Sequence, residues 1–94
     1  MNELRDLADI MPSSRVSRTR LPDQTGVVLD IVGLNVMSLN ETGQFVVEQL
    51  ARGLAAEDEM VRRMVAEFKV DELTARRDLG EFVVRLRELL PPRR

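Results

Sequence analysis

The spacing of apolar residues changes character at Asn40, and this change limits the possible folds more than any other feature of the sequence. Before Asn40 the apolar residues come in short alternating or β-branched runs, which are typical of strands. After Asn40 they recur every three or four residues, which is the period of a helix that packs on one face. A chain of 94 residues has room for one domain around one core. We therefore expect an α+β domain, a three-stranded antiparallel meander followed by three helices, with winged helix-turn-helix proportions.

Three short segments carry the strand patterns. Residues 16–20 alternate weakly, residues 27–32 form a β-branched run, and residues 34–39 alternate again. Gly33 is the predicted turn between the last two segments, with Asn35 as the alternative.

The third strand, residues 34–39, is expected to have two different faces. Met37 and Leu39 share one face and Val36 and Ser38 the other, because successive side chains of a strand alternate. In a three-stranded meander the first and third strands are the edges, and an edge carries unpaired backbone N–H and C=O groups. Such an edge can accept a further strand from a peptide.

Three helices are predicted after Asn40, over residues 41–51, 57–68 and 72–90. Asn40 and Asp71 stand just before the first and the third helix. Their side-chain oxygens can accept a hydrogen bond from a free backbone N–H, which favours the start of a helix there.

The two ends of the chain lie outside this pattern. Residues 1–14 contain only a short apolar repeat, and Pro12 interrupts it. We expect residues 1–14 to be a flexible, loosely held arm, residues 15–91 to be the folded domain, and residues 92–94 to be a tail.

The composition excludes several classes of chemistry. The sequence has no Cys and no His, which removes disulfides, thiol nucleophiles, imidazole acid–base catalysis and the usual zinc ligand sets. It also lacks a glycine-rich phosphate-binding motif. We therefore expect a protein that is not an enzyme and that holds no metal and no cofactor.

The distribution of charge predicts a cytoplasmic protein without membrane contact. No apolar run approaches the roughly 20 residues that span a bilayer. The first ten residues include Glu3, Arg5, Asp6 and Asp9, which is unlike a signal peptide.

The predicted third helix has a core stripe with two different shoulders. The stripe consists of Ala75, Leu79, Phe82, Leu86 and Leu89. One shoulder carries Asp78, Glu81 and Arg85 and is typical of a solvated flank. The other, which we call the apolar shoulder, carries Leu73, Gly80, Val83 and Val84 and is bordered by Arg76 and Arg87.

Gly80 in the middle of a helix needs an explanation, because it costs about 1 kcal/mol relative to Ala. Close approach of another backbone is one reason to keep a glycine. That backbone belongs either to another element of this domain or to a partner segment in a groove. In the second case Arg76 and Arg87 are placed to pair with acidic side chains of the partner.

If the third helix lies beside the third strand, the strand edge and the apolar shoulder together form a slot for a peptide. The strand would contribute Leu34, Asn35, Val36, Met37 and Ser38. The helix would contribute Leu73, Arg76, Gly80, Val83, Val84 and Arg87.

The junction Leu39-Asn40-Glu41-Thr42-Gly43 resembles the Leu-Asn-x-Thr/Glu-Gly junction of the PqqD-like family. Asp78 is similar to the Asp before the Phe-Leu stretch of the family's last helix. From the residues themselves we expect Leu39 to close the core, Asn40 to cap the helix and Gly43 to allow close packing. Leu39, Asn40, Thr42, Gly43 and Asp78 are therefore interpreted as structural residues.

The resemblance implies a function. Members of this family bind the leader segment of a ribosomally synthesised precursor peptide as an extra strand between the third strand and the last helix. They present it to a modifying enzyme, often a radical S-adenosylmethionine enzyme. The expected partners are therefore a precursor leader peptide and a modifying enzyme.

The order of strands and helices also allows a winged-helix regulator that binds nucleic acid. The third helix carries Arg76, Arg77, Arg85 and Arg87 together with Glu72, Asp78, Glu81 and Glu88. This balance, with a net charge of -2, gives no basic face for phosphate contact, so nucleic acid is not the expected partner. The exposed strand edge leaves both a monomer and an edge-paired homodimer open.

Overall fold

The computed structural model describes residues 3–91, so the predicted tail at residues 92–94 lies outside the described residues. The elements are α1 (Glu3–Ile10), β1 (Val16–Arg20), β2 (Gly26–Asp30), β3 (Asn35–Leu39), α2 (Glu41–Ala51), α3 (Glu57–Phe68) and α4 (Glu72–Leu89). The α+β class is confirmed, with a three-stranded sheet followed by helices. Because α1 precedes the sheet, residues 3–91 contain four helices instead of three, and the winged-helix description is approximate.

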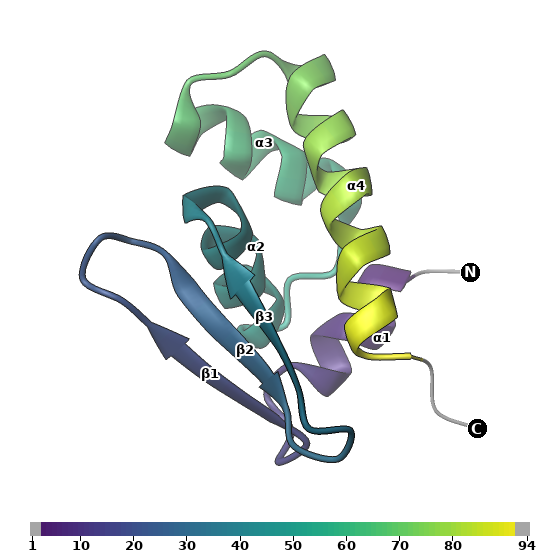
Figure 1. The fold of residues 1–94 in the computed structure, drawn as a ribbon. Coiled ribbons are helices and arrows are strands. Elements are labelled where there is room, and N and C mark those ends of the chain that lie inside the picture. Colours follow the sequence, from purple (N-terminus) through teal and green to yellow (C-terminus); the bar gives the residue numbers. More distant parts are fainter. Residues whose placement is uncertain (1–2, 92–94) are drawn as a thin grey trace.

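The sheet has the order β1-β2-β3, and both strand pairs are antiparallel. Val28 in the middle of β2 faces Arg18 of β1 and Met37 of β3. The edges of the sheet are therefore β1 and β3, as predicted. Figure 1 shows α2 packed behind the sheet and α4 running alongside β3, in agreement with their contacts.

The turn between β2 and β3 spans residues 31–34 and includes Gly33, as predicted. Leu34 belongs to this turn and not to the strand. Its φ is 57°, in the left-handed region, and its side chain is exposed. The turn begins at residue 31 because buried Asp30 organises it: Asp30 Oδ1 accepts a hydrogen bond of 3.2 Å from the N–H of Val32 and lies 3.4 Å from Arg15 Nε.

Helix α2 is the centre of the core. It packs against β2, β3, α1 and α3, and its Val46, Val47 and Leu50 are fully buried. The Asn40 side chain accepts a hydrogen bond of 2.8 Å from the N–H of Gly43, so Asn40 is the predicted N-cap. Leu39, at the end of β3, is buried, as expected of a residue that closes the core.

The N-terminal segment differs from the expectation of a loosely packed arm. Leu7 and Met11 are fully buried, and α1 packs against α2. The hydroxyl of Ser13 donates a hydrogen bond of 2.6 Å to the carbonyl of Ile10, which helps the chain to turn from α1 toward β1. The expectation of weak packing is wrong for residues 3–11, because the short apolar repeat is one helix face that α2 covers.

Candidate functional site

Helix α4 is fixed in place by its cap and its core stripe. The Asp71 side chain accepts a hydrogen bond of 2.7 Å from the N–H of Thr74 at the start of the helix, as predicted. The predicted core stripe is buried throughout and consists of Ala75, Leu79, Phe82, Leu86 and Leu89. This packing holds α4 beside β3.

Two adjoining shallow hollows lie along α4, and together we call them the cleft. The first is lined by Asn35, Val36 and Met37 of β3 and by Arg85, Glu88 and Leu89 of α4. The second is lined by Asn40, Thr42 and Gly43 at the β3–α2 junction and by Asp78, Glu81, Phe82 and Arg85 of α4. Because the start of β3 lies against the end of α4, the two elements run in opposite directions along the cleft.

The hydrogen bonds at the two ends of the β1–β2 pair show which residues of β2 form their backbone hydrogen bonds with β1. The N–H of Leu21 donates to the carbonyl of Thr25 at 2.9 Å, and the N–H of Ile31 donates to the carbonyl of Arg15 at 2.8 Å. In an antiparallel ladder the residues that bond to one neighbour alternate with those that bond to the other. The odd-numbered residues of β2 therefore bond to β1, and the even-numbered residues bond to β3.

The same alternation identifies the free backbone groups of β3. Val28 is opposite Met37 in the register, so Met37 bonds inward to β2. Val36 and Ser38 alternate with Met37 along β3, so their backbone N–H and C=O groups point away from the sheet. A strand added to β3 would bond to these two residues.

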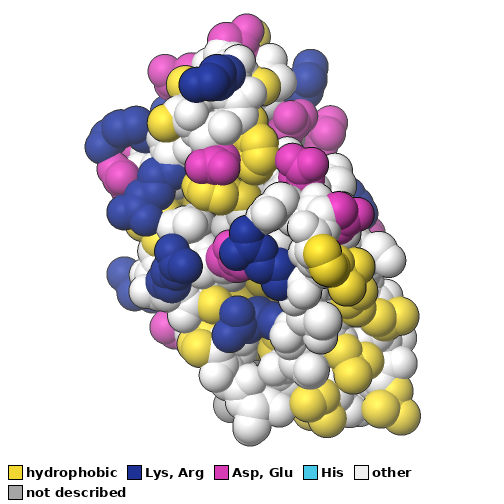
Figure 2. Space-filling view, turned by 90° about the vertical axis from the view of Figure 1, so that its left-hand side faces the viewer, with side chains coloured by type: hydrophobic (Ala, Val, Ile, Leu, Met, Phe, Trp, Pro, Cys, Tyr) yellow, Lys and Arg dark blue, Asp and Glu magenta, His cyan; other side chains and the backbone are white. Residues whose placement is uncertain are grey.

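The two edges of the sheet differ in charge. Arg18 and Arg20 are exposed on β1, whereas β3 carries no charged side chain. Charged side chains discourage a further strand from joining an edge, so β3 is the edge that is open to strand addition. Figure 2 shows a related contrast on one face of the molecule: most basic side chains lie on the left of the view, and hydrophobic side chains gather at the lower right. The exposed hydrophobic side chains around the start of β3 are Ile31, Val32, Leu34 and Val36.

Three of the five predicted strand residues line the cleft, and the other two do not. Asn35, Val36 and Met37 line it, and Ser38 lies on the open edge of β3. Leu34 lies in the preceding turn.

The apolar shoulder of α4 lies away from the cleft. Gly80, Val83 and Arg76 line a different hollow, which Glu3 and Leu4 of α1 complete. Leu73 and Val84 are exposed. No backbone approaches Gly80, because a Cβ built there has nothing within 4 Å among the residues that the structure describes.

The opposite shoulder, which the sequence pattern assigned to solvent, forms the α4 wall of the cleft. It contributes Asp78, Glu81 and Arg85, and Glu88 extends it. The sequence carried no signal for this arrangement, because a charged helix flank is usually solvated.

The two arginines expected to hold an acidic peptide already have partners in the chain. Arg76 contacts Glu57 at 3.2 Å, Asp58 at 2.9 Å and Glu72 at 3.0 Å. Its hydrogen bond to Asp58, and to a lesser extent that to Glu72, raises the pKa of its guanidinium above the usual value.

Arg87, the second of these arginines, ties α4 to α1. It pairs with Asp6 and donates a hydrogen bond of 3.1 Å to the carbonyl of Leu90. The structure therefore provides no support for a peptide-binding role of either arginine.

Arg85 differs from these two arginines. It is exposed, it lines both hollows of the cleft, and within residues 3–91 it makes no hydrogen bond or ion pair. Glu81 and Glu88 are likewise exposed and unpaired in the described part of the chain.

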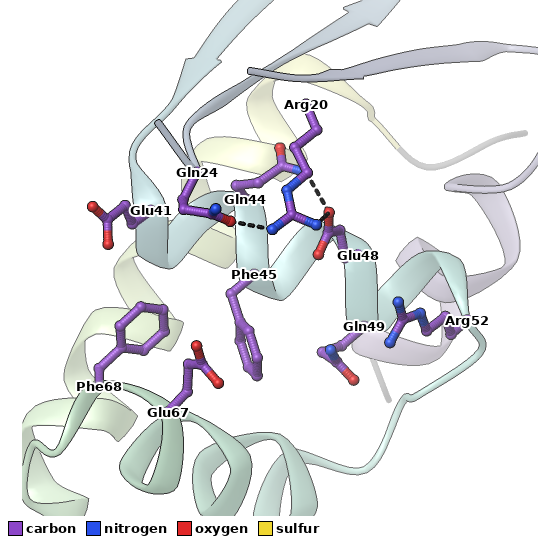
Figure 3. Close-up of a pocket in the computed structure, with 10 residues that line it drawn as sticks. All are labelled: Arg20, Gln24, Glu41, Gln44, Phe45, Glu48, Gln49, Arg52, Glu67 and Phe68. Carbon is purple, nitrogen blue, oxygen red and sulfur yellow. Dashed lines mark hydrogen bonds and ion pairs between the residues drawn. The ribbon is translucent and has the colours of Figure 1, made fainter. Parts of the chain in front are cut away.

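A further hollow lies between the β1–β2 hairpin and α2 and α3 (Figure 3). Its polar side chains bond to one another: Glu48 lies 3.3 Å from Arg20 and accepts a hydrogen bond of 2.9 Å from Gln44. Phe45 and Phe68 meet edge to face at 5.4 Å. These contacts fasten the hairpin to α2, so we assign this hollow a structural role.

The described residues offer neither a metal centre nor a membrane span. Between residues 3 and 91 no group of three or more acidic side chains is arranged to hold a metal ion. None of the helices in that range is long and apolar enough to cross a membrane.

Comparison with known proteins relates residues 25–89 to one protein family. The sequence profile of the family described as coenzyme PQQ synthesis protein D (PqqD) matches residues 25–89. No curated protein matches the chain. The structure is similar to that of TbiB1 in complex with the TbiA(beta) leader peptide, with 28% identity, a TM-score of 0.72, and coverage of 87% of this chain and 95% of that one.

A second solved structure supports the fold alone. It is lasso peptide synthetase B1 complexed with the leader peptide, with 24% identity and a TM-score of 0.67. The alignment covers 81% of this chain and 87% of that one.

Proposed function

This chain belongs to the PqqD family, and on that basis we propose that it binds the leader segment of a ribosomally synthesised precursor peptide as a fourth strand on β3. The observation that carries the proposal is the open, uncharged edge of β3 beside α4. Val36 and Ser38 would supply the main-chain hydrogen bonds. The similar structure of TbiB1 holds a leader peptide, which supports the same kind of ligand here.

The cleft is suited to an extended peptide. Side chains of an added strand alternate between its two faces, so every second one would point toward α4. There they would meet half-buried Met37 and the buried Phe82 and Leu89, while the charged residues of α4 remain at the rim. Main-chain bonds would provide affinity and these side chains would provide selectivity.

The proposed role is that of an accessory protein without chemistry of its own. It holds the leader in the cytoplasm while a separate enzyme modifies the rest of the precursor. Helix α4 does not favour nucleic acid as the ligand, because three of its four arginines are paired with carboxylates of this chain.

Backbone hydrogen exchange tests this function. The probe is a synthetic peptide with the sequence of the leader segment of the proposed precursor. Saturating peptide is expected to slow exchange of the Val36 and Ser38 amides, because each gains a main-chain acceptor. We expect a dissociation constant on the order of 1 µM.

The other edge strand is the internal control. The amides of Arg18 and Arg20 point away from β2 by the same alternation, and their exchange should not change. Protection of Arg18 and Arg20 in place of Val36 and Ser38 would place the peptide on β1 and overturn the proposed site.

A further inference from the structure

We propose that Arg85 fixes the register of the bound peptide by pairing with one acidic side chain, while Glu81 and Glu88 reject that side chain in the neighbouring registers. The inference rests on the proposed function, because it concerns a peptide bound along β3. It identifies the ligand as a leader segment with a carboxylate at one defined position.

A peptide on β3 needs such a device because main-chain hydrogen bonds do not read sequence. A slip by two residues keeps every main-chain bond and every side-chain face, and moves the peptide by about 6.8 Å. The edge of β3 carries no charge that could distinguish the two registers.

Helix α4 presents charges at a matching spacing. At about 1.5 Å rise per residue, Glu81 lies about 6 Å and Glu88 about 4.5 Å from Arg85 along the helix axis. A two-residue slip would therefore carry a peptide carboxylate from the cation toward one of the two anions. Attraction at one register and repulsion at the adjacent ones is how charge gives specificity.

Among residues 3–91 these three side chains have no hydrogen-bond or ion-pair partner, which leaves them for a peptide. Glu81 and Glu88 stand four and three residues from Arg85, at distances in sequence where helical ion pairs can form, yet neither pairs with it. The other arginines of α4 are engaged: Arg76 with three carboxylates, Arg77 with Asp78 at 3.6 Å, and Arg87 with Asp6. Arg85 is therefore the cation of α4 that remains for a ligand.

The first experiment measures peptide affinity. Each Asp or Glu of the synthetic leader is replaced singly by Asn or Gln, and every peptide is titrated against the wild type and Arg85→Gln. For the wild type, one replacement is expected to weaken binding by about fivefold, the scale of one partly exposed ion pair. The same replacement should weaken binding to Arg85→Gln by less than about twofold, because the ion pair is already broken in this variant.

Arg18→Gln is the matched control. Arg18 is exposed on the opposite edge strand and makes no ion pair within residues 3–91, so its substitution removes the same charge away from the cleft. It should reproduce the wild-type peptide profile. Equal melting temperatures for the three proteins would show that the substitutions leave the fold intact.

The second experiment measures register. A spin label at the peptide N-terminus is expected to broaden the amide signals at one end of β3 only. In the double variant Glu81→Gln, Glu88→Gln the broadening should spread along β3, because slipped registers are no longer penalised.

The outcomes separate this inference from the proposed function. If Val36 and Ser38 are protected but Arg85→Gln still distinguishes the acidic peptides as the wild type does, the register assignment fails and the binding site stands. If the wild type protects neither amide, the binding site fails and the register assignment fails with it.

Discussion

Gly43 and Gly80 are both helical glycines, but their surroundings are opposite. A Cβ on Gly43 would lie 2.8 Å from Cε1 of the Phe82 ring, which is buried and cannot move aside freely. We expect Gly43→Ala to lower the free energy of unfolding by about 1–3 kcal/mol, the usual cost of overpacking. Urea denaturation of the two proteins measures this difference.

Gly80→Ala provides the contrasting result. A Cβ at Gly80 meets nothing within 4 Å, so the substitution should raise stability by about 1 kcal/mol through helix propensity. Peptide affinity should stay unchanged, because Gly80 lies away from the cleft. Weaker peptide binding by Gly80→Ala would mean that the ligand does lie on the apolar shoulder.

Residues whose partners are close in sequence were predictable, and residues whose partners are distant were not. Asn40 caps a backbone group three residues away, so its role follows from the local motif. Arg87 pairs with Asp6, which is 81 residues away, and nothing in the sequence around either residue indicates this contact.

At the scale of elements, periodicity predicted the helices well but did not show which neighbour lies at each shoulder of α4. The core stripe gave the buried face correctly, yet both shoulders flank that stripe. The choice between them depends on which side α1 covers and which side faces β3. Because the sequence pattern predicts a loose arm over residues 1–14, it does not identify α1 as the element of this domain that lies beside the apolar shoulder, and the shoulder is included in the predicted peptide slot.

The Asp71 cap at the start of α4 should make the stability of the fold depend on pH. Hydrogen bonds from Thr74, first from its side chain and then from its backbone, lower the pKa of Asp71 below its usual 3.8. A carboxyl whose pKa is lower in the folded than in the unfolded protein stabilises the fold at pH values above its unfolded pKa. This stabilisation is lost as the pH falls through its folded pKa. The cap should therefore contribute at neutral pH and be lost below pH 3.8.

Asp71→Asn isolates this effect, since Asn also caps helices but does not titrate. The melting temperature of the wild type relative to Asp71→Asn should fall when the pH is lowered from about 7 to about 3. A difference that is the same at both pH values would show that the Asp71 charge does not stabilise α4.

At the scale of the whole molecule, α1 determines which side of α4 stays open. It packs on α2, it completes the hollow beside Gly80, and its Asp6 engages Arg87. With that side occupied, the free charges of α4 lie on the side of β3. The N-terminal helix thus supports the cleft without contributing to it.

Leu7→Ala tests whether α1 is an integral part of the fold. Leu7 is fully buried, so its truncation should lower the free energy of unfolding by about 2–5 kcal/mol. Asp9→Ala is the control within the same helix, because Asp9 is exposed and its loss should change stability by less than about 0.5 kcal/mol. Urea denaturation compares the two.

Equal midpoints would mean that α1 does not pack in solution, as the sequence pattern suggested. In that case the apolar shoulder would be accessible, and its coverage by α1 would no longer be an argument for placing the peptide on the Arg85 side of α4.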